Sequence, residues 1–382
     1  MLAILVETIT TIFALCGMGF YFAALWSARS FVRRKRMGAE EFHPAVSILK
    51  PLKGFDLDMY AAFASHCRQQ YAGEYEILFG VSSLEDPSVA AVEQLKAEFP
   101  EVAVRLVVTP EVLGANGKVS NLAQMLPHAR FDHVLINDSD IRVSPRYLAR
   151  VMAPLQDPQV GMVTALYRGR AHGTVWSRLE ALGIATDFAA GVLTARKLEG
   201  GIRFGLGSTL AVSRAALDAI GGLAPLADYL ADDYELGARI AGKGHRVELC
   251  DEVVETTVPA YSFRQFWEHQ LRWARGMRDS RKTGYAGVVF TFGLPWALLN
   301  VVASGVDLFS LALLSLVLAA RVTLALAVGV GVLNDVRVLR DLWLLPLRDV
   351  IAFGVWVWSY AGNTVVWRGQ EFGLKDGKLV GR

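Results

Sequence analysis

Long apolar runs lie towards both ends of the chain, and a middle region alternates short apolar runs with amphipathic ones. Residues 2–26 carry almost no charge and are long enough to span roughly 30 Å of hydrocarbon. Two more apolar runs cover residues 286–304 and 308–333, and a third, at 342–367, is interrupted by a proline and two charges. The pattern predicts about four membrane segments. The last is either a shorter span from about residue 350, which we favour, or a re-entrant element.

Residues 43–260 have the pattern of an α/β domain. Short apolar runs of strand length alternate with stretches of helical character, which predicts a largely parallel sheet with right-handed crossovers. In such sheets ligands bind beyond the carboxyl ends of the strands. The expected strands cover residues 46–49, 75–81, 102–109, 133–137 and 161–166, and the expected helices cover residues 58–70, 86–99, 118–126 and 176–198.

Residues 262–282 give the clearest amphipathic helix. At helical spacing Phe266 and Trp273 share one face, while Arg264 and Arg275 lie on the opposite face. Aromatic residues on one face and arginines on the other suit a helix lying in the membrane interface. The alternative is a helix of the domain core with a solvated outer face.

Composition agrees with a membrane protein. Of the 382 residues, 53% are apolar and 20% charged, and the apolar excess is concentrated at the two ends. The net charge of +2 gives no case for nucleic-acid binding. Cys16, Cys67 and Cys250 have no paired spacing, so they indicate neither a disulfide framework nor a zinc site.

Positive charges follow the first apolar run directly. A secretory signal peptide has its positive charge before the apolar region, so this order predicts an uncleaved anchor. The positive-inside bias then places the following domain in the cytoplasm. Arg321, inside a later apolar run, is costly in lipid and is a secondary functional candidate. The positive cluster comprises Arg29, Arg33, Arg34, Lys35 and Arg36.

Two acidic pairs are candidates for chemistry. Asp138 and Asp140 end an apolar run, and on extended chain residues two apart point to the same side. Paired carboxylates suit Mg²⁺ or Mn²⁺, with a diphosphate supplying further ligands. An isolated Asp-x-Asp, however, is more often a strand ending in a solvated turn. Asp232 and Asp233 open a later helix, where capping alone explains only the first of them.

Five segments occur in an order that resembles one known family. Together with the membrane segments, they resemble the membrane-embedded inverting glycosyltransferases with a GT-A fold. The resemblance is greatest to the ceramide glucosyltransferase family and its bacterial relatives that glycosylate hopanoids, and it extends from about residue 47 to the C-terminus. The segments are Lys50-Pro51-Leu52-Lys53-Gly54, residues 114–122, Asp138-Ser139-Asp140-Ile141-Arg142-Val143, Ala231-Asp232-Asp233-Tyr234 and Arg272-Trp273.

The resemblance implies a fold and a division of the chain. The fold is an α/β GT-A-type nucleotide-sugar-binding domain, with a mixed, mostly parallel sheet and with N-terminal and C-terminal transmembrane helices. The expected parts are a transmembrane anchor at 1–28, a cytoplasmic catalytic domain at 43–260, an interfacial helix with the Arg-Trp motif at 261–284, transmembrane helices at 285–367 and a tail at 368–382.

The resemblance also implies roles for the acidic pairs. Asp138 and Asp140 hold the metal and the donor diphosphate, and Asp233, beside Asp232, is the catalytic base. Arg272 and Trp273 lie against the leaving diphosphate and the sugar. The remaining donor-binding candidates are Lys50, Lys118, Asn121, His269 and Gln270.

This chain departs from the family pattern in three places. One is Asp140, the second carboxylate of Asp-Ser-Asp, which resembles the wider glycosyltransferase pattern more than that of the eukaryotic enzymes. The family's first acid follows the second strand at once, whereas Ser82 and Ser83 stand there in this chain. Asp86 is the best surrogate for that acid, and Glu85 is the alternative. His269 occupies a position where the family usually has Gln or Arg.

The implied activity is sugar transfer from a UDP-sugar, UDP-glucose or UDP-N-acetylglucosamine, to the hydroxyl of a ceramide-like or hopanoid-like membrane lipid. Inversion would give a β-linked glycolipid. The implied partners are the donor, Mg²⁺ or Mn²⁺, the lipid acceptor and the bilayer. One alternative is a processive polysaccharide synthase, for which about four spans are too few. Another is a catalytically silent nucleotide-sugar-binding membrane protein. The sugar, the lipid, the metal and the oligomeric state stay open.

Overall fold

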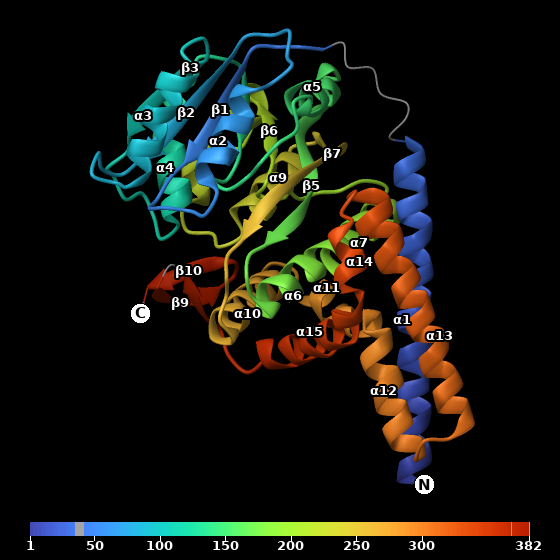
Figure 1. The fold of residues 1–382 in the computed structure, drawn as a ribbon. Coiled ribbons are helices and arrows are strands. Elements are labelled where there is room, and N and C mark those ends of the chain that lie inside the picture. Colours follow the sequence, from blue (N-terminus) through green and yellow to red (C-terminus); the bar gives the residue numbers. More distant parts are fainter. Residues whose placement is uncertain (35–41, 368, 382) are drawn as a thin grey trace.

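The computed structural model describes residues 1–34, 42–367 and 369–381 (Figure 1). Lys35 and Arg36, two members of the positive cluster, lie outside the described residues. An α/β domain occupies one end of the molecule, and long apolar helices extend away from it (Figure 1).

A seven-stranded mixed sheet forms the α/β domain, with strand order β3-β2-β1-β4-β6-β5-β7. The first four strands are parallel, β6 runs antiparallel to both β4 and β5, and β5 is parallel to β7. All five predicted strands are present, and β6 and β7 were not predicted. The strands are β1 (Val46–Pro51), β2 (Tyr75–Val81), β3 (Ala103–Val108), β4 (His133–Ile136), β5 (Val160–Ala171), β6 (Leu210–Ser213) and β7 (Arg246–Val258).

The helices of this domain include the four that the pattern predicts. The predicted helix at 176–198 is interrupted by a π turn, Ile184–Phe188. Asp58 precedes α2 as expected, but its φ of 61° is left-handed and its side chain makes no cap. The helices are α2 (Met59–Cys67), α3 (Ser88–Glu98), α4 (Gly117–Met125), α5 (Tyr147–Met152), α6 (Val175–Gly183), α7 (Ala189–Leu198), α8 (Arg214–Ala219) and α9 (Asp232–Gly242).

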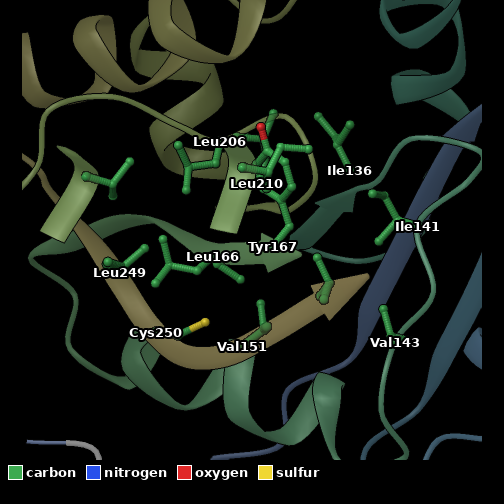
Figure 2. Close-up of a cluster of buried hydrophobic side chains, with 14 of the residues drawn as sticks. Ile136, Ile141, Val143, Val151, Leu166, Tyr167, Leu206, Leu210, Leu249 and Cys250 are labelled. Carbon is green, nitrogen blue, oxygen red and sulfur yellow. The ribbon is translucent and has the colours of Figure 1, made fainter. Parts of the chain in front are cut away.

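One apolar cluster lies between the strands in the second half of the sheet and α5. Figure 2 shows Ile136, Leu166, Leu210 and Leu249, from β4 to β7, together with Val151 of α5. These side chains are nearly inaccessible to solvent. Burying each contributes about 1.5–3 kcal/mol. The cluster therefore holds in place the strand ends from which the loops of the candidate site emerge.

The apolar helices α1, α12 and α13 run side by side (Figure 1). Among the described residues, Ala3–Arg34, Leu308–Val332 and Arg337–Ser359 are long and apolar enough to cross a membrane, and a pair bent by 55°, Lys282–Thr291 with Gly293–Ser304, adds a fourth if it is one span. The helices are α1 (Leu2–Arg34), α11 (Lys282–Gly287), α12 (Gly293–Ser304), α13 (Leu308–Ala325), α14 (Arg337–Asp341) and α15 (Leu345–Ser359).

The last apolar helix does not run parallel to the others. α15 begins at Leu345, not near residue 350, and runs across the direction of α1 and α13 (Figure 1). It packs against the amphipathic helix α10 (Phe263–Ser280). Because Arg337–Ser359 is nonetheless long and apolar enough to cross a membrane, the choice between a span and a re-entrant element stays a prediction.

The predicted amphipathic helix is confirmed as α10; Arg264 on its arginine face is exposed, whereas the arginines nearer its C-terminal end are partly covered. Arg275 donates to the carbonyl oxygen of Thr364, and Arg278 donates to those of Ser359 and Gly362. The sequence pattern shows only the polarity of these arginines. The partners that cover them come from nearly one hundred residues later in the chain.

The end of the chain forms a second sheet. β8 (Thr364–Trp367), β9 (Gln370–Lys375) and β10 (Lys378–Gly381) are antiparallel, so residues expected as the end of a membrane helix and a tail are strands. Asp376 and Gly377 both have positive φ, 51° and 79°. An Asp-Gly pair is the usual two-residue turn of a hairpin, and it is the signal that could have predicted β9 and β10.

Candidate active site

The two predicted acidic pairs meet around one lysine. Lys118 Nζ, on α4, lies 2.7 Å from Asp138 Oδ1 and 3.5 Å from Asp232 Oδ2. Gly207 lies beside both pairs, because a Cβ added there would be 3.2 Å from Asp233 Oδ2 and 3.7 Å from Asp138 Oδ2. Segments far apart in the sequence thus place carboxylates and one ammonium at the carboxyl edge of the sheet.

Asp138 and Asp140 converge through a turn, not through the extended chain that the sequence suggested. β4 ends at Ile136, and the Ile141 amide donates to the Asp138 carbonyl oxygen at 3.3 Å. The Asp138 side chain is 40% exposed, whereas Asp140 is held inward. The pair therefore presents one accessible and one shielded carboxylate.

Asp140 is fixed by the end of β7. Its Oδ2 accepts a hydrogen bond from Thr256 Oγ1 at 2.5 Å and another from the Thr257 amide at 3.0 Å. Burial, together with the charge of Asp138, raises the pKa of Asp140 to about 6. Two such carboxylates repel each other, and a cation between them would relieve that repulsion.

The carboxylate oxygens of this site suit a divalent ion that also binds a diphosphate. Across the described parts of the chain, no three His, Cys, Asp or Glu side chains are grouped to hold a metal by themselves. Mg²⁺ usually takes one or two protein carboxylates and completes its shell with phosphates and water. Asp138 and Asp140 would supply these protein oxygens.

Asp233 is held at the start of α9 by two backbone amides. Its Oδ2 accepts from the Gly207 amide at 2.7 Å, and its Oδ1 from the Tyr234 amide at 2.8 Å. Burial and then the neighbouring charge of Asp232 raise the pKa of Asp233 to about 6, against the opposing effect of Lys118. A fixed carboxylate with this pKa is ionised at neutral pH and suits general-base chemistry.

Lys50 lies beneath the site. It is fully buried and its Nζ donates to the Asp138 carbonyl oxygen at 3.0 Å. Burial lowers the pKa of Lys50 to about 7, although Asp140 and Asp138 act in the opposite direction. This hydrogen bond supports the loop that carries Asp138.

Asp86, the expected surrogate for the family's first acid, holds a neighbouring loop in place. Asp86 accepts from the Gly54 amide at 2.9 Å and from the Ser88 amide at 2.9 Å, whereas Glu85 is exposed. Asn121 donates to the Gly80 carbonyl oxygen at 2.8 Å. Both residues hold loops at this edge of the sheet, and their roles with a donor stay predictions.

The motif on α10 packs against α6. Gln270 donates to the buried carboxylate of Glu180, and His269 Nδ1 lies 3.3 Å from Glu180 Oε1. The His269 ring also lies 5.2 Å from that of Trp273, measured between centroids. Arg272 is half-buried on the same helix. Gln270, predicted to contact the donor, is thus engaged by Glu180.

An aromatic row leads from α10 to the carboxylates. Trp273 contacts Phe188 at 6.0 Å between centroids, and Phe188 contacts Tyr167 of β5 at 5.1 Å. Tyr167 projects from the end of β5 among the cluster of Figure 2. Its position beside the candidate base was not predicted, because strand alternation shows which face a residue occupies but not what lies opposite.

Asn116 is another residue that the sequence analysis missed. It caps α4 by accepting from the Val119 amide at 3.1 Å. Its Nδ2 donates to the Tyr229 carbonyl oxygen at 2.8 Å and lies 3.3 Å from Asp232 Oδ1. Asn116 therefore joins the helix of Lys118 to that of Asp232. Its cap position before α4 was the available signal.

The C-terminal sheet braces the same region. Leu379 donates through its amide to the Asp228 carbonyl oxygen at 2.7 Å, and the Leu230 amide donates to that of Gly377 at 3.0 Å. The buried Leu379 belongs to a cluster against which Ala115 and Leu230 pack. This sheet thus contacts the segments leading into both α4 and α9.

Comparison with known proteins agrees with this architecture. The sequence model of glycosyl transferase family 21 matches residues 9–380. Ceramide glucosyltransferase 3 of Caenorhabditis elegans is 24% identical over 286 residues, which cover 70% of this chain and 59% of that protein. Beta-monoglucosyldiacylglycerol synthase of Synechocystis is 25% identical over 243 residues, covering 61% and 48% respectively. The chain therefore matches only about half the length of these curated relatives.

A solved structure shares the fold. It is a mannosyltransferase from Pyrobaculum calidifontis in complex with GDP-Man and Mn²⁺, 20% identical, with a TM-score of 0.56 over 92% of this chain and 99% of that one. The expected GT-A-type fold, with a mostly parallel sheet and apolar helices at both ends, is confirmed. With a match that covers nearly all of its length, the chain belongs to glycosyl transferase family 21.

Proposed function

We propose that the chain transfers a hexose from UDP-glucose or UDP-N-acetylglucosamine to the hydroxyl of a ceramide-like or hopanoid-like membrane lipid, with inversion. The observation that carries the proposal is the grouping of Asp138, Asp232 and Asp233 around Lys118, beside the aromatic end of α10. Membership of family 21 and relatives named for glycolipid synthesis support the substrate class.

Asp233 is the proposed general base. Its carboxylate is oriented by the Gly207 and Tyr234 amides, so it loses little freedom when an acceptor hydroxyl binds. It takes the proton as the acceptor oxygen attacks the anomeric carbon and the bond to the diphosphate breaks. One attack opposite the leaving group inverts that carbon, so an α-linked donor yields a β-glycoside.

Positive charge stabilises the leaving diphosphate in this proposal. A divalent ion held by Asp138 and Asp140 would neutralise negative charge that develops on the departing phosphate. Lys118 lies between Asp138 and Asp232 and is well placed to exchange one carboxylate for a phosphate oxygen. Arg272, with Trp273 beside it, is the proposed contact to the diphosphate and sugar.

The membrane helices fit a lipid acceptor. α10 and α15 lie together beside the α/β domain, and the apolar helices α1, α12 and α13 extend from it (Figure 1). We propose a multi-pass membrane protein whose catalytic domain, residues 43–260, faces the cytoplasm, with the helix at 261–284 completing the site. The acceptor then keeps its hydrocarbon in the bilayer while its hydroxyl reaches Asp233.

The test is transfer by the purified full-length protein in lipid vesicles. Radiolabelled UDP-glucose or UDP-N-acetylglucosamine is supplied with ceramide, hopanoid or diacylglycerol, and products are identified by mass spectrometry, with Asp233→Asn as the control. One sugar per lipid supports the proposal. A polymer would identify a polysaccharide synthase, and no UDP release with any acceptor would leave the silent binding protein as the better reading.

A further inference from the structure

A small pocket lies beside the end of β5, and none of the candidate-site carboxylates lines it. It has a volume of about 140 Å³ and lies between the end of β5, α6 and α14. Neighbouring side chains of a strand point to opposite faces. Arg170 therefore points to the face opposite Tyr167, whereas Gly169 and Ala171, on the Tyr167 face, line the pocket through their backbone and small side chain. Its charged lining includes Arg170, Arg337, Arg340, Asp335 and Asp341.

The carboxylates on one side of this pocket already have cationic partners. Arg337 Nε lies 2.7 Å from Asp335 Oδ1, and its Nη2 lies 3.0 Å from Glu255 Oε2. Glu255 also pairs with Arg168 at 3.2 Å. Two carboxylates are thus matched by two guanidinium groups, so they leave little negative charge to repel an anion.

On the other side of the pocket, positive charges outnumber negative charges. Asp341 alone pairs with two arginines, Arg178 and Arg340. Within the described ranges, the Arg170 guanidinium makes neither a hydrogen bond nor an ion pair, although the residue is half-buried in the pocket wall. Four arginines share three carboxylates, and Arg170 adds a fifth positive charge. The pocket therefore has unused capacity to donate to an anion.

The pocket lies beside the apolar part of the molecule. α14 follows the candidate span Leu308–Val332, at the end of α13 nearest the α/β domain (Figure 1). α14 and the residues on either side of it carry three exposed apolar side chains: Val336 is 67% exposed, Leu339 54% and Trp343 67%. Tryptophan is typical of the membrane–water interface, and basic pockets at the ends of membrane helices suit anionic headgroups.

We propose that this pocket binds the phosphate of an anionic phospholipid. The guanidinium groups of Arg170, Arg337 and Arg340 donate to the phosphate oxygens, since guanidinium geometry matches phosphate. The acyl chains then lie along the exposed apolar side chains of α14 and the turn after it. The bound lipid fixes the depth of the α/β domain at the membrane, and the site does not depend on the proposed transferase activity.

The experiment compares lipid retention by the full-length protein. Wild type, Arg170→Gln and Arg33→Gln are placed in nanodiscs of phosphatidylcholine with or without phosphatidylglycerol, and lipids that remain bound are counted by native mass spectrometry. Arg33 is the matched control because it is exposed at the end of α1, outside the pocket. An unfolding temperature for Arg170→Gln equal to that of wild type in pure phosphatidylcholine verifies its fold.

We expect wild type and Arg33→Gln to retain phosphatidylglycerol, and Arg170→Gln to bind it about fivefold more weakly. Arg340→Gln should weaken retention in the same direction. Equal retention by wild type and Arg170→Gln overturns the proposal, and equal losses in Arg170→Gln and Arg33→Gln show diffuse attraction instead of a site. If inorganic phosphate at millimolar concentration displaces the lipid completely, the pocket takes a free anion and the lipid proposal fails.

Discussion

The pH dependence of sugar transfer tests the proposed base most directly. Asp233 has a pKa raised to about 6, first by burial and then by Asp232, while Lys118 lowers it. A base acts only when it is ionised, so its activity is present above its pKa and is lost as the pH falls through it. The rate should therefore decrease about tenfold for each pH unit below about 6.

The part of the pH profile where the rate falls towards low pH is called the acid limb. Two neutralising substitutions should move this limb in opposite directions along the pH axis. Asp232→Asn removes a negative neighbour, so the pKa of Asp233 falls and the limb shifts to lower pH. Lys118→Met removes a positive neighbour, so the limb shifts to higher pH. We expect each shift to be on the order of one pH unit, equivalent to about 1.4 kcal/mol between the two protonation states.

The assay measures initial rates of lipid-linked sugar between about pH 5 and pH 8, with saturating metal and donor. Changes in the overall rate are expected in both variants, because Lys118 and Asp232 contact other site residues, and only the position of the limb is interpreted. Asp233→Asn should lose about 10²–10⁴-fold in rate at every pH. Acid limbs that stay fixed in both variants, or an active Asp233→Asn, would refute Asp233 as the base.

Three further predictions concern the metal, the α10 motif and the C-terminal sheet. Asp138→Ala should abolish transfer and divalent-metal binding, measured by calorimetry with Mn²⁺; a wild-type rate that a chelator leaves unchanged would exclude the metal. Glu180→Gln should raise KM for the donor several-fold more than it lowers kcat, because Gln270 loses a charged partner; an unchanged KM would show that this contact does not orient the motif. Leu379→Ala should cost about 2–5 kcal/mol of local stability, seen as faster hydrogen exchange over residues 364–381. Transfer should fall with it, and full activity despite the faster exchange would contradict the bracing role.

Much of the fold could be predicted because its patterns are local. The parallel strands β1, β2 and β4 are short apolar runs, and the sheet buries such runs on both faces. β6 was missed because its four residues, Leu210–Ser213, lead directly into α8 at Arg214 without a separate turn that would mark the end of a strand. β7 carries charges at positions such as Glu248 and Glu255, which pair with arginines from distant segments, so its pattern does not resemble a buried strand.

The candidate site could be predicted only in part. Asp138, Asp140 and Asp233 were singled out by residue type and order, and the structure brings them together. The assignment of Gln270 to the donor stays a prediction, and its hydrogen bond to Glu180, a buried acid that has no distinguishing sequence context, was not predicted. A role that depends on a partner elsewhere in the chain cannot be inferred from a short segment of sequence.

The sequence by itself determined the apolar segments, the α/β alternation, the amphipathic α10 and the acidic residues available for chemistry. These follow from hydrophobic periodicity and side-chain type, which act over a few residues. Only the tertiary structure decided that α15 turns across the other apolar helices, and that the last strands brace the loops before α4 and α9. It alone placed Lys118 between Asp138 and Asp232. Such contacts join distant segments, and they depend on how the whole chain packs.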